Sequence, residues 1–327
     1  MAGLFDGRVA IVTGSGQGVG KAIAMCLAEN GCKVVTNNRK PGSNRNCFDG
    51  GNIDFTESEK KRLDSVIGDA ESTAAEIIAK GGEAIPVYAD VARAEDCKKL
   101  VDAAVEKWGR IDIIVNNAAA TWVGNVADMP IEMFDIVVAS KLNGAFYMLH
   151  YALPYMKEQH YGRILNVSSN AFQGLMGMSA YSAAACGVWA MTKSIAQDLA
   201  GTGITCNCYT PLAKTRSWYN MLATYRIQNV PEEAVEAGAP AAMKTGPEGM
   251  APFICYLCSE EAEYINGIMF NVAADGYLAV HSDSQEYNIT RKDILHNGPW
   301  TFDELRVRVK EELMKDVKGA TTAIELH

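Results

Sequence analysis

Residues 13–20 have the residue types and the spacing that bind a phosphate group. They read Thr-Gly-Ser-Gly-Gln-Gly-Val-Gly and lie between a β-branched run at 8–13 and a segment at 21–31 with apolar residues at helical spacing. Glycines let backbone amides approach a pyrophosphate, and the amino terminus of the following helix favours its negative charge. This run therefore predicts a strand, a nucleotide-binding turn and a helix.

Two further polar segments follow predicted strands. Asp90-Val91 comes after the apolar run 84–88, and the segment 116–119, Asn-Asn-Ala-Ala, follows the run 111–115. Ligands of parallel sheets bind at the carboxyl ends of the strands, so we expect both segments to lie beside the glycine-rich turn.

The elements that must position these residues alternate along the chain. Apolar strands separated by helical segments favour a doubly wound parallel α/β sheet, Rossmann-like, with about seven strands. The strands are expected at 8–13, 33–36, 84–88, 111–115, 163–167, 204–208 and 268–272, and the main helices at 69–80, 94–108, 131–158, 180–200 and 247–259.

Length and composition suggest one large domain with an appendage. The chain has 327 residues, 48% of them hydrophobic, and single cores stop growing beyond about 250–300 residues. We expect a dinucleotide-binding catalytic domain at 1–280, interrupted by a polar insertion at 41–66, and a C-terminal extension at 281–327. The extension includes one amphipathic helix, which packs on the domain or on a neighbouring subunit.

The charge pattern and the cysteines exclude several classes of protein. The net charge is −9 with both signs interspersed, which disfavours nucleic acid and anionic membranes as partners. No apolar run reaches the roughly 20 residues of a membrane span. Nine scattered cysteines and the absence of a signal peptide predict a cytoplasmic setting. Cys255 and Cys258 lack partners with metal-ligand spacing, so we expect core residues and no metal site.

Together, these motifs resemble the short-chain dehydrogenase/reductase family. The TGxxxGxG, DV and NNAG signatures of that family match residues 13–20, 90–91 and 116–119, and the match runs in order across residues 7–275. The resemblance implies a bound nicotinamide dinucleotide and an oxidoreductase.

The same resemblance assigns cofactor contacts by position. It implies that Asp90 lies near the adenine, that Asn117 and Ala118 lie near the adenosine, and that Thr215 touches the nicotinamide carboxamide. The full implied set is Gly14, Ser15, Gln17, Gly18, Val19, Gly20, Asn38, Arg39, Asp90, Val91, Asn117, Ala118 and Thr215.

The resemblance also implies a reaction centre with two hydroxyl groups. Ser168 follows the strand 163–167, and Tyr181 comes thirteen residues later, at the start of the helix 180–200. In the family, a Ser and a Tyr with this separation hold a carbonyl oxygen, and the Tyr gives or takes the proton. Such chemistry asks for a phenol within reach and a second donor for the developing oxyanion.

The family's lysine, four residues after the Tyr and on the same helix face, is replaced here by Ala185. Loss of that ammonium should slow any step that uses Tyr181 as a base. The family usually has an Asn where this chain has Lys141, and our hypothesis is that Lys141 places its ammonium near the vacated site. The alternatives are a solvated Lys141 with a disabled or redirected site, and an engineered Lys→Ala change at 185.

Cofactor preference depends on the end of the second strand. An acid there would bind the ribose hydroxyls, whereas a cation would pair with a 2′-phosphate. The segment 36–40 has no acid but contains Arg39 and Lys40, so NADP(H) is favoured over NAD(H). Alternatively, Arg39 is a surface charge or stacks on the adenine.

The segment 212–240 has the position of a substrate lid, and it is rich in aromatic residues and methionine. Together with Phe172, Met176 and Met178, it favours a bulky apolar substrate, although such stripes also form cores. The insertion and the tail are similar to (3R)-hydroxyacyl-CoA dehydrogenase modules of peroxisomal multifunctional enzymes and to bacterial hydroxysteroid dehydrogenases. This resemblance implies a fatty acyl-CoA, a steroid or a comparable lipophilic substrate.

The main expectation is hydride transfer between NAD(P)(H) and a secondary alcohol or ketone. One alternative is a non-redox isomerase, lyase or cyclase that uses Tyr181 for proton transfer only, and another is a catalytically silent dinucleotide-binding protein. By family resemblance, the assembly is a homotetramer or homodimer formed through the helices 131–158 and 180–200.

Overall fold

The computed structural model describes residues 3–42, 54–227, 229–283 and 289–315, with side chains described outside 282–293. One sheet of nine strands runs through these residues in the order β3-β2-β1-β4-β5-β6-β7-β8-β9. The strands are β1 (Val9–Val12), β2 (Lys33–Asn38), β3 (Ala84–Tyr88), β4 (Ile113–Asn116), β5 (Gly162–Val167), β6 (Ile204–Leu212), β7 (Met269–Ala273), β8 (Leu278–Asp283) and β9 (Ile289–Ile294). The predicted doubly wound sheet with seven parallel strands is confirmed.

The sequence did not predict β8 and β9, which pair antiparallel at the edge of the sheet beyond β7. Leu278 and Val280 face the core, but β9 (Ile289–Ile294) reads Ile-Thr-Arg-Lys-Asp-Ile. A mostly polar edge strand has a weak hydrophobic signal, because hydrogen bonds to its neighbour rather than burial on both faces hold it.

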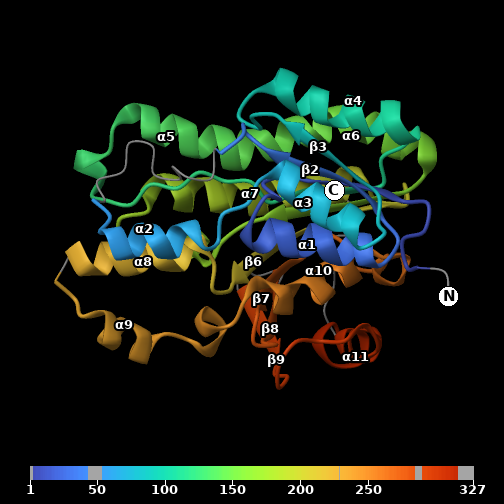
Figure 1. Cartoon of the computed structure of the whole chain (residues 1–327). Helices are drawn as coiled ribbons and strands as arrows, with labels where there is room; N and C mark the ends of the chain where they lie inside the picture. Colours follow the sequence, from blue (N-terminus) through green and yellow to red (C-terminus); the bar gives the residue numbers. More distant parts are fainter. Residues whose placement is uncertain (1–2, 43–53, 228, 284–288, 316–327) are drawn as a thin grey trace, which may run out of the picture.

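Helices cover both faces of the sheet (Figure 1). They are α1 (Gly18–Glu29), α2 (Glu57–Asp64), α3 (Ala70–Ala79), α4 (Ala94–Trp108), α5 (Ile131–Val138), α6 (Gly144–Gln159), α7 (Ser179–Asp198), α8 (Arg216–Ile227), α9 (Glu232–Gly238), α10 (Ala251–Cys258) and α11 (Phe302–Arg308). One core lies under α1, α3, α10 and α11, and the other lies under α4, α6 and the end of α7. Neighbouring residues of β1 alternate between the two cores, which explains the continuous apolar strand sequences.

The helix expected at 131–158 is interrupted by a single π turn at Ala139–Asn143. The path stays helical on both sides, in α5 and α6, and the turn contains Lys141. An extra residue in a helical turn changes the direction in which the following side chains point, and such π turns are frequent at functional sites.

Within the described residues, the segment 300–314 of the tail packs on the domain. Trp300, Leu305 and Val309 are buried in the core under α10, and α11 begins with a capping box at Thr301. The expected tail helix is therefore present as α11, followed by a π turn at Val309–Leu313. In the insertion expected at 41–66, α2 lies within the described residues, whereas 43–53 lie outside them.

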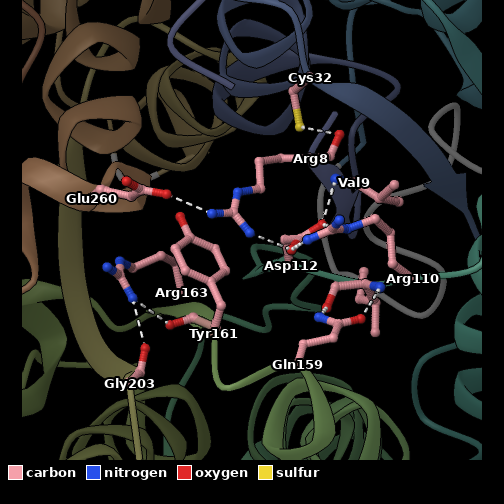
Figure 2. Close-up of polar contacts among 12 residues, drawn as sticks. Arg8, Val9, Cys32, Arg110, Asp112, Gln159, Tyr161, Arg163, Gly203 and Glu260 are labelled. Atoms are coloured by element: carbon pink, nitrogen blue, oxygen red, sulfur yellow. Dashed lines mark hydrogen bonds and ion pairs between the residues drawn. The ribbon is translucent and has the colours of Figure 1, made fainter. Parts of the chain in front are cut away.

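Charged residues at the amino ends of the strands form a structural network (Figure 2). The buried Asp112 carboxylate accepts hydrogen bonds from the Val9 amide at 2.9 Å, from Arg8 at 3.1 Å and from Arg110 at 2.7 Å. The Arg8 guanidinium also lies 3.6 Å from the centre of the Tyr161 ring. These hydrogen bonds occupy both oxygens of the carboxylate. The network lies at the edge of the sheet opposite the carboxyl ends, where ligands are expected.

Candidate active site

The turn after β1 has the close backbone approaches that its glycines predict. Gly14 has φ +64° and Gly18 has φ +55°. A Cβ on Gly20 would lie 2.4 Å from the Gly14 carbonyl oxygen and 2.5 Å from Asn117 Nδ2. Only a residue without a side chain allows the start of α1 to approach the turn this closely.

The ends of β1 and β4 are bonded to each other at this turn. Asn117 Nδ2 donates to the Thr13 and Gly14 carbonyls at 3.1 and 3.3 Å. The Ala118 amide donates to Thr13 Oγ1 at 3.1 Å, and Ala118 Cα lies 3.0 Å from the position of a Gly14 Cβ. The structure therefore brings Gly14, Gly20, Asn117 and Ala118 together.

Thr215 reaches the same turn from the segment after β6. Its Cγ2 lies 3.6 Å from the position of a Cβ on Gly18. Gln17, at the start of α1, makes no side-chain capping bond, and its buried Oε1 has no hydrogen-bond partner among the described residues. An uncapped helix start and an orphaned polar atom fit a polar ligand such as a dinucleotide.

Ser15 and Val19 complete the turn. Ser15 is buried, its amide donates to the Asn37 carbonyl, and its Oγ accepts from the Asn37 amide at 2.8 Å. Val19 is partly buried and packs against the core under α1. Of the predicted turn residues, Ser15 thus ties the loop to β2 rather than presenting its hydroxyl to solvent.

The end of β2 includes an acidic neighbour that the sequence did not indicate. A Cβ on Gly16 would lie 2.1 Å from Asn38 Oδ1 and 2.5 Å from Asp69 Cα, so α3 begins directly beside the turn. The Asp69 carboxylate accepts from the Tyr88 hydroxyl at 3.0 Å and caps α3. These bonds lower the pKa of Asp69, so it is ionised at neutral pH. The Arg39 side chain is exposed beyond Asn38.

Asp90 and Val91 follow β3 and lie near the π turn. Asp90 Oδ1 accepts from the Ala92 amide at 3.1 Å. A Cβ on Gly144 would lie 2.9 Å from the Val91 carbonyl oxygen. The segment after β3 is therefore held against the start of α6, just after Lys141 in sequence.

Lys141 is buried, with 2% of its surface exposed. Its Nζ donates to the Val167 and Ser168 carbonyls at 2.9 and 3.1 Å and lies 3.5 Å from the Tyr181 hydroxyl. Burial lowers the pKa of Lys141 to about 7, because the charged form loses its hydration. Ala185 is fully buried, so no solvated gap remains at its position.

The Ser168 hydroxyl is bonded to α7, the helix that contains Tyr181. Ser168 is buried, and its Oγ donates to the Ala185 carbonyl at 2.9 Å. A hydroxyl has one hydrogen, so this bond uses the only donor of Ser168. The neighbouring Ser169 side chain lies close enough to Tyr181 to lower the pKa of the phenol.

Tyr181 thus lies between a hydroxyl and an amine. Burial raises its pKa to about 12, and the nearby Ser169 side chain opposes that rise. The Lys141 Nζ also lies 4.6 Å from the centre of the Tyr181 ring. Sequence reasoning chose Ser168 for its thirteen-residue separation from Tyr181 and gave no role to Ser169, which only the folded structure places near the phenol.

The predicted lid and its apolar residues are divided between core and surface. In α8, Trp218 and Leu222 are buried, whereas Tyr225 is partly exposed. Between Ser169 and Tyr181, Leu175 is half exposed and Met176 is 98% exposed. Part of the aromatic stripe is therefore core, and exposed apolar side chains lie both on the loop before α7 and at the end of α8.

Two kinds of site are not found within the described part of the chain. No group of three or more His, Cys, Asp or Glu side chains is close enough to hold a metal ion. No helix among these residues is both long and apolar enough to cross a bilayer. Cys255 and Cys258 lie in the core, in α10.

Comparisons with known proteins agree with this architecture. A family model described as Enoyl-(Acyl carrier protein) reductase matches residues 63–276. The 3-oxoacyl-[acyl-carrier-protein] reductase of Synechocystis sp. is 35% identical over 267 residues, which cover 81% of this chain and 95% of that protein. Peroxisomal multifunctional enzyme type 2 of Mus musculus is 35% identical over 303 residues, which cover 92% of this chain but 36% of that protein.

A solved structure extends the likeness to the whole fold. The crystal structure of a short chain dehydrogenase from Mycobacterium avium matches with a TM-score of 0.67 and 30% sequence identity, and the match covers 97% of both chains.

Proposed function

Because this chain belongs to the short-chain dehydrogenase/reductase family, we propose that it transfers hydride between NAD(P)(H) and a secondary alcohol or ketone. The observation that carries this proposal is the 3.5 Å distance between the Lys141 Nζ and the Tyr181 hydroxyl in a buried site. The Ser169 side chain supports it, because it lies close enough to lower the pKa of Tyr181. These groups supply a proton donor, a cation and an oxyanion donor within one buried site.

When bound, the nicotinamide ring supplies hydride to a carbonyl carbon or takes it from a carbinol carbon. In reduction, the Ser169 hydroxyl donates a hydrogen bond to the carbonyl oxygen as that oxygen becomes negative, and Tyr181 gives it a proton. In oxidation, Tyr181 takes the proton from the alcohol. Ser169 replaces Ser168 in this proposal, because the Ser168 hydroxyl is bonded to the Ala185 carbonyl.

The Lys141 amine has the hydrogens and the lone pair that proton exchange with Tyr181 requires. As an ammonium, it has three hydrogens for its three contacts, the Val167 carbonyl, the Ser168 carbonyl and the Tyr181 oxygen. As a neutral amine, it keeps two hydrogens for the carbonyls and directs its lone pair to the Tyr181 hydrogen. Both protonation states therefore satisfy the same contacts, and Lys141 takes the part of the cation that Ala185 cannot supply.

The proposed cofactor is NADP(H), held by the glycine-rich turn, by Asn117 and Ala118 and by Thr215. Arg39 and Lys40 support the preference, because they are exposed cations next to the end of β2. The carboxylate of Asp69 also lies in this region, but the Tyr88 hydroxyl and the Ser72 amide already bind it.

The proposed substrate is bulky and apolar, such as a fatty acyl thioester or a steroid. The exposed Leu175 and Met176, on the loop between Ser169 and Tyr181, support this, as does the partly exposed Tyr225 in α8. We propose that residues 212–240 form a lid over a catalytic domain at 1–280. The eight cysteines in the described residues are all free, which supports a reducing, cytoplasmic setting.

Turnover assays test this function. Purified protein is mixed with NADPH or NADH and with β-ketoacyl thioesters, ketosteroids and short ketones, and oxidation of the cofactor is compared with formation of the alcohol. We expect one alcohol for each NADPH oxidised, with a higher kcat/KM for NADPH than for NADH. Conversion of substrate without net change in the cofactor would favour a non-redox enzyme, and binding of the cofactor without any conversion would favour a silent protein.

A further inference from the structure

The 3-10 turn Asn170–Gln173 directs the Ser169 hydroxyl. Ser169 Oγ accepts a hydrogen bond from the Ala171 amide at 3.2 Å, and the Phe172 amide donates to the Ser169 carbonyl at 3.0 Å. Because Ser169 caps this turn, a shift of the turn moves the hydroxyl relative to Tyr181.

A chain of polar side chains connects the turn to the far edge of the sheet. The Thr210 hydroxyl in β6 lies 3.1 Å from Asn170 Oδ1 and 2.5 Å from Asn271 Oδ1 in β7, and its single hydrogen can be donated to one of these oxygens at a time. Asn271 Oδ1 lies 3.0 Å from His281 Nε2 in β8. An amide oxygen only accepts hydrogen bonds, so Nε2 carries the hydrogen in this arrangement.

A second path of contacts runs through aromatic rings. The Phe172 ring, on the same turn, meets the His281 ring edge to face, with centroids 5.5 Å apart and planes at 84°. Phe172 also meets Trp189 of α7 at 5.1 Å and 70°. The His281 ring therefore contacts the turn directly through Phe172. It also binds Asn271, whose side-chain oxygen shares the Thr210 hydroxyl with Asn170 of the turn.

This polar chain is not needed to fill the core. Thr210, Asn271 and His281 are buried, and removal of polar groups from water costs free energy that their mutual hydrogen bonds only offset. Apolar side chains of similar volume would pack there without that cost. Hydrogen bonds are directional, so they fix the groups that they join in one position. Here the group that is fixed is the turn that follows Ser169.

We propose that His281 is a positioning residue for the active site, acting from the antiparallel strand β8 through Asn271, Thr210 and Phe172 to hold the Ser169 turn. The proposal rests on the proposed function for its effect on turnover. Its effect on the turn itself depends only on the contacts described above.

The test compares His281→Leu, which removes the donor, with His281→Gln, whose side-chain amide can donate to the Asn271 oxygen. His296→Leu is the matched control. His296 lies in the same extension, but its ring stacks on Trp300 and bonds Glu304. Hydrogen exchange of the Ala171 and Phe172 amides reports on the turn, and kcat and KM report on catalysis.

In His281→Leu, we expect exchange of these amides to accelerate at least tenfold and kcat to fall about tenfold, because small displacements of a catalytic group cost that much or more. KM for the cofactor should stay unchanged, since the glycine-rich turn is not involved. His281→Gln should recover most of both effects, and His296→Leu should show neither.

Unchanged exchange in the turn, or equal damage from Leu and Gln, would overturn the proposal. So would acceleration spread evenly over the domain, because that result would indicate general destabilisation. If His281→Leu does not fold, Thr210→Val breaks the same chain at β6 with little change in volume, and the same readouts decide. A wild-type protein that converts no substrate would refute the proposed function, while the exchange data would still decide whether His281 holds the turn.

Discussion

Lys141 is a single buried amine that joins the end of β5 to Tyr181. Its position at 3.5 Å from the Tyr181 hydroxyl is what a compensating cation requires, whereas a solvated lysine would be exposed. A buried amine is costly when charged. It is retained where bonds to carbonyls hold it, as the Val167 and Ser168 carbonyls do here.

Replacement of this amine tests the compensation. Lys141→Met should lower kcat about a hundredfold, in the range that a proton-transfer partner contributes. The double variant Lys141→Met/Ala185→Lys should recover part of the loss, because position 185 lies one helical turn after Tyr181. Lys98→Met, which removes an exposed amine paired with Asp102, is the control. Steady-state turnover measures all three, and wild-type activity in Lys141→Met would rule out the compensation.

The pH profile should follow the Lys141 amine rather than the phenol. The pKa of Lys141 is about 7 and that of Tyr181 is about 12. Oxidation of an alcohol needs the neutral amine, so its kcat/KM should rise with pH up to about 7, and reduction of a ketone should decline above the same pH. Lys141→Met should move both transitions toward the Tyr181 value. Identical profiles in the two proteins would contradict the assignment.

Unfolding experiments check the same pKa without turnover. The folded pKa of Lys141 is lowered from 10.5 to about 7. Between these values the unfolded chain binds more protons than the folded chain, so stability rises with pH. The free energy of unfolding of the wild type should therefore increase relative to that of Lys141→Met between pH 7 and 9.

The two adjacent serines should differ in effect. Ser169→Ala should lower kcat about a hundredfold, the cost of losing one oxyanion donor. Ser168→Ala should lower the free energy of unfolding by about 1 kcal/mol through the lost bond to the Ala185 carbonyl, with a smaller effect on kcat. Kinetics and denaturant unfolding of both variants separate the two roles, and the reverse ranking of kcat would exclude Ser169 as the donor.

At the scale of elements, the two ends of the parallel strands have different roles. The carboxyl ends of β1, β4 and β5 carry the turn, Asn117 and Ser169, whereas the amino ends carry the network around Asp112. The π turn at Ala139–Asn143 places Lys141 between α5 and α6. Residues far apart in the sequence meet at each edge, because parallel strands bring all their carboxyl ends to one edge and all their amino ends to the other.

The amino-end network should affect stability but not turnover. Asp112→Ala leaves the buried Val9 amide and the partly exposed Arg8 and Arg110 without their shared carboxylate, and the unsatisfied amide alone costs about 1–3 kcal/mol. Asp102→Ala, which breaks the exposed pair with Lys98, should cost less than about 1 kcal/mol. Denaturant unfolding and kcat should be measured for both variants. A stable Asp112→Ala protein that has lost activity would contradict this view.

At the scale of the whole molecule, the described residues of α5 and α6 include exposed apolar side chains. Ile131 and Phe134 of α5 are 78% and 43% exposed, and Phe146 of α6 is 52% exposed. Clustered exposed apolar residues usually mark an interface. This supports the proposal of a homodimer or homotetramer formed through the helices at 131–158 and 180–200.

A charge placed in that surface should dissociate the assembly. Phe146→Glu is expected to reduce the mass in solution, because each interface would bury an unpaired carboxylate. Val307→Glu, an exposed position on α11, should leave the mass unchanged. Light scattering after size exclusion measures both, and a wild-type protein that is a monomer at all concentrations would refute the interface.

The sequence by itself determined the class of fold, the seven parallel strands and the glycine-rich turn, because periodicity and glycine positions are local properties of the chain. The sequence also indicated that position 185 lacks the lysine of the family pattern and that position 141 has a lysine where the family usually has an asparagine. Only the tertiary structure decided that the Ser168 hydroxyl binds the Ala185 carbonyl, that Asp69 lies beside the glycine-rich turn and that His281 contacts the Ser169 turn. These relations depend on side-chain direction and on contacts between distant segments, which spacing along the chain does not specify.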